Sequence, residues 1–342
     1  MLDLSILEWY AGDVLQLDIP TDGLVTFRAG DAWRAGLTDG KTIIDLSEST
    51  GFRSVVEALD AGWEALDVAR SALRDGGRAR PVSEAELGPV ITAPAKILCL
   101  GINYASHARE TGHEMPAAPD VFAKFATCLN GPYADVPLWA TSQQIDYEGE
   151  FAVVIGKTTR SVSEADALEY VGGYCVINDV TARDVQFRTG QWTIGKSLDL
   201  FGPLGPALVP PSAVPDPQNL WLRTTVNGEE RQRANTSEMG FPVARIIAYL
   251  STFMTLHTGD VIATGTPAGV GFKRNPPRIC ARATSSKSKS TALAASGTRL
   301  SREVLRALMR SLDIALSDQR AKPVLRDRAL TALEARNRPL SG

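Results

Sequence analysis

The sequence lacks the features that mark secreted, membrane-spanning or zinc-finger proteins. No stretch of its 342 residues approaches the roughly 18 consecutive apolar residues that a membrane-spanning helix needs. Its first residues carry acids where a signal peptide needs a basic segment. The four cysteines lie far apart without a CxxC pair, which disfavours a zinc site and a disulfide framework. We therefore expect a cytoplasmic protein with buried thiols and no membrane partner.

Other protein classes are also disfavoured by what the sequence does not contain. No internal repeat is visible, which argues against a propeller or a solenoid. The glycine-rich segments have neither the spacing of a dinucleotide-binding fingerprint nor that of a phosphate-binding loop. Apolar residues make up 44% and charged residues 22% of the chain, which is ordinary for a globular protein and excludes wholesale disorder.

Charge is divided unevenly along the chain. Residues 279–342 contain thirteen Lys and Arg against five Asp and Glu, so residues 1–278 carry about −11 of the total net charge of −3. This basic tail begins with a low-complexity stretch. Leu300, Val304, Leu308 and Leu312 recur at four-residue intervals and could line one face of a helix. Because the tail lacks interleaved aromatic residues, we expect no nucleic-acid partner.

The pattern of apolar runs predicts two folded parts. Residues 1–92 read as a small α+β domain, and the segment 81–94 at its end reads as the linker to the next part. Residues 95–278 are dominated by short β-type runs set off by Gly and Pro, with helices predicted at 163–171 and 242–251. The expected fold class is therefore α+β and strand-rich.

The segment 145–155, Ile-Asp-Tyr-Glu-Gly-Glu-Phe-Ala-Val-Val-Ile, contains two acids at strand spacing. In a β-strand, Glu148 and Glu150 share one face, while Phe151 and Val153 point oppositely into a core. Two such carboxylates repel each other unless a cation lies between them, and a hard divalent ion is the natural partner. A metal site and an exposed strand face both remain open as interpretations.

A third acid lies at the end of another predicted strand. The run from Tyr174 begins apolar and ends in polar residues, so Asp179 sits at the mouth of the strand, closely followed by Arg183 and Gln186. A solvated strand end would explain the same pattern, and both interpretations stay open.

The segment 101–113 contains a histidine and an acid three residues apart. If it is helical, His107 and Glu110 are neighbours, and the carboxylate can fix the imidazole tautomer and raise its basicity. Such a pair can activate a water. The glycines at 101 and 112 bracket the segment in the manner of a mobile lid.

Two further segments are weak signals by themselves. Lys196 is the one lysine in a turn-rich, otherwise apolar stretch at 195–206. The glycine-rich loop at 263–271 follows a predicted strand, and its backbone N–H groups can cradle a carboxylate.

In this order the motifs resemble the fumarylacetoacetate hydrolase superfamily. The resemblance covers residues 95–277 closely and residues 1–94 loosely. The matching motifs are G-x-N-Y-x-x-H-x-x-E at 101–110, D-Y-E-x-E at 146–150, N-D-V-T-A-R-D-x-Q at 178–186, G-K-S-x-D-x-F-x-P-x-G-P at 195–206 and T-G-T-P-A-G-V-G at 264–271.

The resemblance implies a β-roll of mixed sheets, usually paired as a homodimer, and a role for each motif residue. The metal ligands for Mg²⁺ or Mn²⁺ would be Glu148, Glu150 and Asp179. The catalytic residues would be His107 and Glu110 on the lid, which activate water, and Lys196, which stabilises an enolate or oxyanion. The substrate contacts would be Tyr104, Arg183, Gln186 and Thr266.

The implied reaction is metal-dependent hydrolysis of a carbon–carbon bond in a 2,4-dioxo acid of the acylpyruvate or fumarylacetoacetate kind. The ion would disperse the charge of the enolate that leaves. Decarboxylation of an oxaloacetate-type acid and isomerisation of a hydroxy-dienedioate use the same kind of site and remain alternatives, as does a scaffold impaired by its altered C-terminus.

The resemblance ends at Pro277. Residues 279–342 form an atypical tail, for which a frameshifted or read-through end is the favoured interpretation. A genuine added tail, disordered or helical, is the rival.

Overall fold

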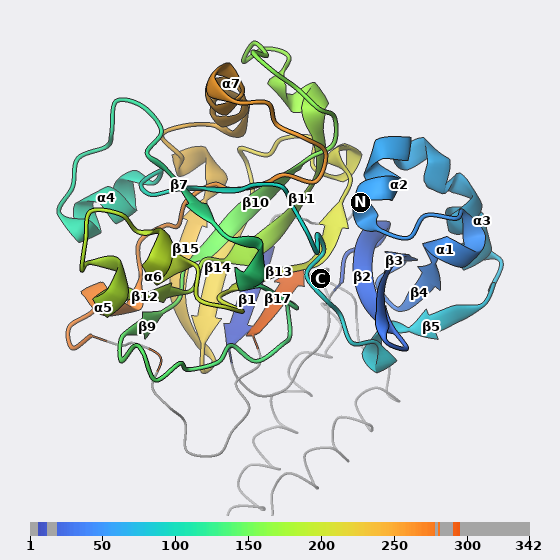
Figure 1. The fold of residues 1–342 in the computed structure, drawn as a ribbon, viewed down its shortest axis with the longest axis horizontal. Coiled ribbons are helices and arrows are strands. Elements are labelled where there is room, and N and C mark those ends of the chain that lie inside the picture. Colours follow the sequence, from blue (N-terminus) through green and yellow to red (C-terminus); the bar gives the residue numbers. More distant parts are fainter. Residues whose placement is uncertain (1–5, 12–18, 278–279, 281–289, 295–342) are drawn as a thin grey trace, which may run out of the picture. The chain divides into compact units, whose positions relative to one another are not determined.

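The structure is a computed structural model that describes residues 6–11, 19–277, 280 and 290–294, all of which fall within one compact unit. It is rich in strands, with parallel and antiparallel pairs in the same sheets and short helices between them (Figure 1). The expected strand-rich α+β fold with mixed sheets is confirmed.

The largest sheet has eleven strands in the order β5-β4-β3-β2-β13-β11-β10-β16-β6-β7, with β8 paired to β13. The pairs β6–β16 and β8–β13 are parallel and the others are antiparallel. The strands are β2 (Gly23–Ala29), β3 (Ala32–Thr38), β4 (Thr42–Asp45), β5 (Ala79–Pro81), β6 (Ile97–Leu100), β7 (Val121–Lys124), β8 (Leu129–Asn130), β10 (Gly149–Ile155), β11 (Val171–Asn178), β13 (Gly202–Val209) and β16 (Val261–Ala263).

Two smaller sheets and short helices complete the described fold. A four-stranded sheet has the order β15-β14-β1-β17, and β9 pairs with β12. These strands are β1 (Ile6–Ala11), β9 (Ile145–Asp146), β12 (Thr181–Ala182), β14 (Trp221–Val226), β15 (Glu229–Asn235) and β17 (Ser290–Ala294). The α-helices are α1 (Leu46–Ser49), α2 (Val55–Ala61), α3 (Asp67–Arg74), α4 (Ala105–Thr111), α5 (Arg183–Gln186), α6 (Thr193–Lys196) and α7 (Val243–Phe253).

Strands β10 and β11 lie at the centre of the core, and every residue of both is buried. Their side chains alternate between two apolar clusters, as the period of two in a strand requires. Ala152 and Val154 pack in one cluster, whereas Phe151 and Val153 pack in the other with α7. The predicted inward direction of Phe151 and Val153 is confirmed.

One predicted helix is wrong. Residues 163–171 contain only a 3₁₀ turn, η4 (Ala167–Tyr170), after which β11 begins at Val171. The carbonyl of Tyr170 accepts hydrogen bonds from the N–H groups of Gly156 and Lys157, so tertiary pairing with the end of β10 overrides the local helical signal. The helix predicted at 242–251 is α7.

The first 92 residues are joined to the rest by strand pairing and by packing of the predicted linker. Leu24 of β2 pairs with Leu208 of β13, which makes the sheet continuous. Within the linker, Val90 and Ile91 are buried, and the N–H of Val90 donates to the carbonyl of Leu204 at 3.2 Å. The domain boundary near residue 92 stays a prediction.

Most of the basic tail lies outside the described residues, including Leu300, Val304, Leu308 and Leu312. Of residues 279–342, only Cys280 and the backbone of β17 are described, and β17 pairs antiparallel with β1. The origin of the tail stays a prediction. In the described residues, no helix has the length and apolar character needed to cross a membrane.

We predict that Gly156→Ala destabilises the protein. A Cβ at Gly156 would lie 2.4 Å from the Cα of Gly172, so the ends of β10 and β11 would be forced apart. Overpacking of this kind lowers the free energy of unfolding by about 1–3 kcal/mol, which urea denaturation can measure. Gly190→Ala is the matched control, because a Cβ there meets no atom within 4 Å. Equal stability of the two variants would contradict the close approach.

Candidate metal centre and active site

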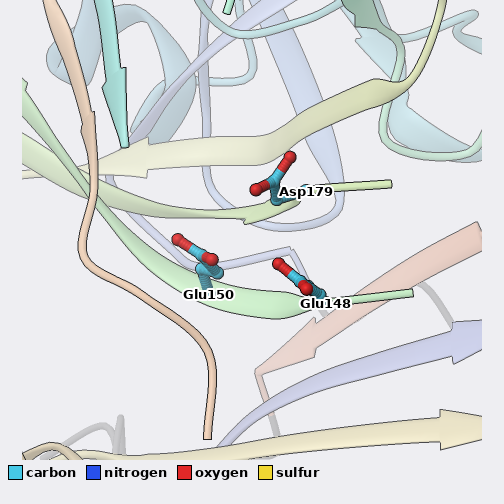
Figure 2. A group of neighbouring side chains, drawn as sticks. All are labelled: Glu148, Glu150 and Asp179. Carbon is cyan, nitrogen blue, oxygen red and sulfur yellow. The ribbon is translucent and has the colours of Figure 1, made fainter. Parts of the chain in front are cut away.

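Three buried carboxylates meet where β10 begins and β11 ends. Glu148 directly precedes β10, Glu150 lies on it, and Asp179 directly follows β11. Because Gly149 pairs with Asn178 across the two antiparallel strands, these positions are adjacent in the sheet. One carboxylate oxygen from each residue lies within 4.8 Å of the others. Figure 2 shows the three side chains gathered beside one another.

Two buried lysines hold two of these carboxylates. Lys196 Nζ donates to Glu148 Oε2 at 2.6 Å and to Asp179 Oδ2 at 2.7 Å. Lys124 Nζ donates to the other Asp179 oxygen, Oδ1, at 2.7 Å, and also to the carbonyls of Lys196 and Phe201. Burial by itself would lower the pKa of Lys196, but Asp179 and Glu148 outweigh it and raise that pKa, so Lys196 stays a cation.

Two buried cations, Arg183 and Lys196, lower the pKa of Glu148. Burial would raise the pKa of this carboxyl, but Arg183 and Lys196 outweigh burial and lower the pKa to about 2. Arg183 Nη2 lies 2.5 Å from Glu148 Oε1. Glu148 is therefore an anion at neutral pH whether or not an ion is bound.

Glu150 differs from Glu148 and Asp179 in its hydrogen-bond partner, which is a backbone N–H and not a lysine. Its Oε2 accepts a hydrogen bond from the backbone N–H of Gly265 at 2.8 Å. Burial, Asp179 and Glu148 together raise the pKa of Glu150 well above its ordinary value. Among the described residues around the site, four buried carboxylates face three buried cations, the carboxylates being Asp146, Glu148, Glu150 and Asp179 and the cations Lys124, Arg183 and Lys196. Glu150 is the carboxylate of this group whose negative charge an additional cation would balance.

The donor set fits a hard divalent ion. Three carboxylates that offer converging oxygens are the ligands that Mg²⁺ and Mn²⁺ prefer. Glu150, which is buried and destabilised in its charged form, is the residue that gains most from a dication. The acidic cluster expected from the sequence is therefore present, whereas the bound ion and its identity stay predictions.

The segment with His107 and Glu110 is the short helix α4, as expected. Gly112 ends it in the left-handed conformation, with a φ of 79°, which glycine adopts without a steric penalty. His107 Nδ1 lies 3.2 Å from Glu110 Oε2, and Glu110 Oε1 accepts from the N–H of Gly269 at 2.9 Å. The imidazole is close enough to Glu148 to contribute, after Arg183 and Lys196, to lowering the pKa of that carboxyl.

Arg183 and Gln186 lie on α5 and contact each other. Arg183 Nη1 donates to Gln186 Oε1 at 3.1 Å, and its Nε and Nη2 donate to Asp146 Oδ2 at 3.0 and 2.9 Å. The guanidinium also lies 4.2 Å from the ring centre of Phe272. Arg183 is thus held by protein groups on several sides, and its expected contact with substrate stays a prediction.

Tyr104 and Thr266 are both buried. The hydroxyl of Tyr104 has no hydrogen-bond partner among the described residues, which is compatible with its expected contact with a ligand. The hydroxyl of Thr266 donates to the carbonyl of Gly149 at 3.0 Å and accepts from Gln232 Nε2 at 2.7 Å. Its single proton is therefore used inside the protein, and the predicted substrate contact remains untested.

Sequence reasoning missed three buried residues of the site. Lys124 could have been noticed as the one charge in the apolar run Val-Phe-Ala-Lys-Phe. Asp146 begins the D-Y-E-x-E motif and accepts hydrogen bonds from Arg183 and from the N–H groups of Gly271 and Phe272. Gln232 stands in a charged stretch. The one feature that could have pointed to its burial is its spacing of two from Ala234, which places both side chains on the buried face of β15.

Comparison with protein families places this chain beside known enzymes. The family model described as fumarylacetoacetate (FAA) hydrolase C-terminal matches residues 96–303. The match thus runs further into the C-terminal segment than the motifs, which ended at Pro277. A mitochondrial oxaloacetate tautomerase from Bos taurus, FAHD2A, is 44% identical over 243 residues, which is 70% of this chain and 77% of that protein.

Two solved structures are similar in both fold and sequence. A fumarylacetoacetate hydrolase from Exiguobacterium antarcticum has a TM-score of 0.67 and 34% identity, over 80% of this chain and 99% of that one. A maleylpyruvate hydrolase from Sphingobium in complex with manganese(II) and pyruvate has a TM-score of 0.62 and 29% identity, over 80% of this chain and 98% of that one.

We predict that Mg²⁺ raises the melting temperature more at pH 8 than at pH 6. Because the folded-state pKa of Glu150 is raised, the metal-free protein binds a proton more tightly when folded than when unfolded, and loses stability as pH rises toward that pKa. A divalent ion takes the place of the proton, so its affinity grows with pH. Thermal denaturation with and without Mg²⁺ measures the difference.

Glu150→Gln is the control for this measurement. It removes the group that titrates, so the metal-free variant should lose less stability between pH 6 and pH 8 than the metal-free wild type, and Mg²⁺ should leave its melting temperature unchanged. An equal Mg²⁺ effect at both pH values, or a Mg²⁺ effect retained by the variant, would argue against Glu150 as a ligand.

Proposed function

The chain belongs to the fumarylacetoacetate hydrolase family, and from that premise we propose that it is a divalent-metal-dependent enzyme that interconverts the keto and enol forms of an oxaloacetate-type 2-oxo acid. The observation that carries the proposal is the buried cluster of three carboxylates beside a protonated lysine and the His107–Glu110 pair. The name of the 44% identical relative supports the substrate class.

The ion would be held by Glu148, Glu150 and Asp179, and Mg²⁺ and Mn²⁺ both suit these oxygen donors. When bound, such an ion supplies a Lewis acid that draws electron density from the keto and carboxylate oxygens of a 2-oxo acid. Lys196 keeps its positive charge beside Glu148 and Asp179, and so adds to the field that favours a negatively charged substrate.

Proton transfer would fall to the lid. Glu110 accepts from the Nδ1–H of His107, which leaves Nε2 as the basic nitrogen. In the keto-to-enol direction, Nε2 takes a proton from C3, the C–H electron pair forms the C2–C3 double bond, and the π pair of the keto group moves onto its oxygen. That oxygen takes up a proton from water, and Nε2 returns the proton that it removed. The reaction is an isomerisation, so no co-reactant is consumed.

Hydrolysis of a 2,4-dioxo acid, the reaction expected from the sequence, is the second candidate. The same Nε2 would take a proton from water, the resulting hydroxide would attack the distal carbonyl, and the C–C bond would break with its electron pair leaving as the enolate of pyruvate. The similarity to the maleylpyruvate hydrolase complex with manganese(II) and pyruvate supports this candidate. Oxaloacetate-type decarboxylation and hydroxy-dienedioate isomerisation remain further predictions for the same site.

A homodimer is the proposed assembly. Large apolar side chains are exposed on two neighbouring segments, 125–139 and 187–200, and these are Phe125, Trp139, Phe187, Ile194 and Leu200. The segments are tied together, because Leu200 N donates to Thr127 O at 3.2 Å and Trp139 Nε1 donates to Asp199 O at 3.1 Å. A second copy would cover such apolar area. The expected cytoplasmic location and the lack of a nucleic-acid partner stay predictions.

We predict that the protein with Mg²⁺ accelerates the decay of enol oxaloacetate, followed by its ultraviolet absorbance. Glu148→Gln should reduce the rate about 100-fold or more, because loss of a ligand weakens retention of the ion. Glu164→Gln, an exposed acid, is the matched control and should match the wild type. An undiminished rate in the Glu148 variant would refute the metal assignment. A wild type without effect on this decay would refute the tautomerase proposal.

His107→Ala tests the role of α4 and separates decarboxylation from the candidate reactions that need a base. Tautomerisation of oxaloacetate and pyruvate release from an acylpyruvate should each fall by about 10²–10⁴-fold, because both need the base. Decarboxylation needs no base, so carbon dioxide release from oxaloacetate should persist if the enzyme is a decarboxylase. Unchanged tautomerisation in this variant would remove His107 from the mechanism.

A further inference from the structure

Gly149, between the two glutamates, lies where the central sheet loses a strand. On one side of β10, β16 pairs only with Ala152–Val154, and the last contact is the N–H of Thr264 donating to the carbonyl of Phe151 at 3.0 Å. In the described part of the chain, no strand continues along this side to Gly149. The backbone N–H and C=O of Gly149 therefore need other partners.

Two side chains take the place of that strand. Gly149 N donates to Gln232 Oε1 at 3.0 Å, and Gly149 O accepts from the hydroxyl of Thr266 at 3.0 Å. Gln232 Nε2 in turn donates to Thr266 Oγ1 at 2.7 Å and to Pro267 O at 2.9 Å. Gln232 is 1% exposed, and both hydrogens of its amide are engaged.

These bonds fix the peptide groups on either side of Gly149. The orientation of these groups sets the directions in which Glu148 and Glu150 leave the strand, because successive Cα–Cβ vectors follow the backbone. Glycine is also required here for space, because a Cβ would lie 2.1 Å from Thr224 Oγ1 on β14. The close approach of the β14–β15 pair is what brings Gln232 to this point.

The same bonds anchor the glycine-rich loop. Thr266 and Pro267 stand between Gly265, whose N–H binds Glu150, and Gly269, whose N–H binds Glu110. Gln232 thus connects the start of β10, where Glu148 and Glu150 lie, with the glycine-rich loop. That loop in turn binds Glu110 of α4.

We propose that Gln232 is a positioning residue of the metal centre, which sets the mutual orientation of Glu148 and Glu150 through Gly149 and Thr266. The inference rests on the proposed function in that these two glutamates are taken as metal ligands. It assigns a role to a residue of β15, which carries none of the predicted site residues.

Gln232→Met tests this role, because methionine keeps the side-chain length and can make none of the three hydrogen bonds. The matched control is Gln218→Met. Gln218 also binds the backbone through its amide, accepting from Val243 N at 2.8 Å and donating to Thr236 O at 2.9 Å, and neither partner belongs to the carboxylate cluster. The probe is Mn²⁺ without substrate, titrated into each full-length variant by calorimetry, together with the metal-free melting temperature.

We expect Gln232→Met to raise the dissociation constant for Mn²⁺ about tenfold or more, as loss of a residue that orients ligands does. Gln218→Met should lower the melting temperature but keep the Mn²⁺ dissociation constant within about twofold of the wild type. A merely structural role of Gln232 would lower the melting temperature of both variants and leave both dissociation constants unchanged, and that result would overturn the proposal.

Thr266→Val keeps the proposal testable if Gln232→Met does not fold. Valine has the shape of threonine but breaks the bonds to Gly149 O and from Gln232 Nε2, so Mn²⁺ binding should again weaken, and unchanged binding would overturn the proposal. A wild type that binds no Mn²⁺ would overturn the metal centre itself and the positioning role with it. If the wild type binds Mn²⁺ and Gln232→Met binds it equally tightly, the positioning role alone would be overturned.

Discussion

The burial of several like charges in one small volume is the constraint on which the rest of this structure depends. Glu148, Glu150 and Asp179 are withdrawn from water at the edge of an apolar core, where an uncompensated carboxylate costs several kcal/mol. Lys196 and Lys124 compensate Glu148 and Asp179 by direct hydrogen bonds, whereas the polar partner of Glu150 is a backbone amide. The protein thus holds a cluster of acids that its own buried cations neutralise incompletely, and this cluster fits a divalent cation.

The glycine-rich loop gives this pocket its geometry. Three of its backbone N–H groups bind three carboxylates from different elements, because Gly265 donates to Glu150, Gly269 to Glu110 and Gly271 to Asp146. The backbone at Gly269 has a φ of 112°, and a Cβ there would lie 1.9 Å from the carbonyl oxygen of Arg231, so only glycine permits this path. One segment consequently holds Glu150 of the carboxylate cluster, Glu110 of α4 and Asp146, the partner of Arg183.

The chemistry of such a site is broader than any single reaction. If a divalent ion is bound by the three carboxylates, such a pocket would stabilise negative charge on a 2-oxo acid; together with the His107–Glu110 pair it would lower the barrier to proton removal beside the keto group and to water attack alike. Which of these reactions dominates depends on whether a water molecule can reach a second carbonyl of the substrate. Tautomerisation needs the fewest positioned groups, because it requires a base and a stabilised enolate but no positioned water.

The local sequence determined much of this protein. Alternation along 145–155 predicted that Glu148 and Glu150 share a face opposite Phe151 and Val153, and the spacing of His107 and Glu110 predicted their contact, because a period of two or of 3.6 is a property of neighbouring residues. The partners of the three residues that sequence reasoning missed were decided by tertiary structure. Lys124 meets Asp179 across 55 positions, and Gln232 meets Gly149 across 83. Strand order and register bring such residues together, and no local pattern encodes which strands become neighbours.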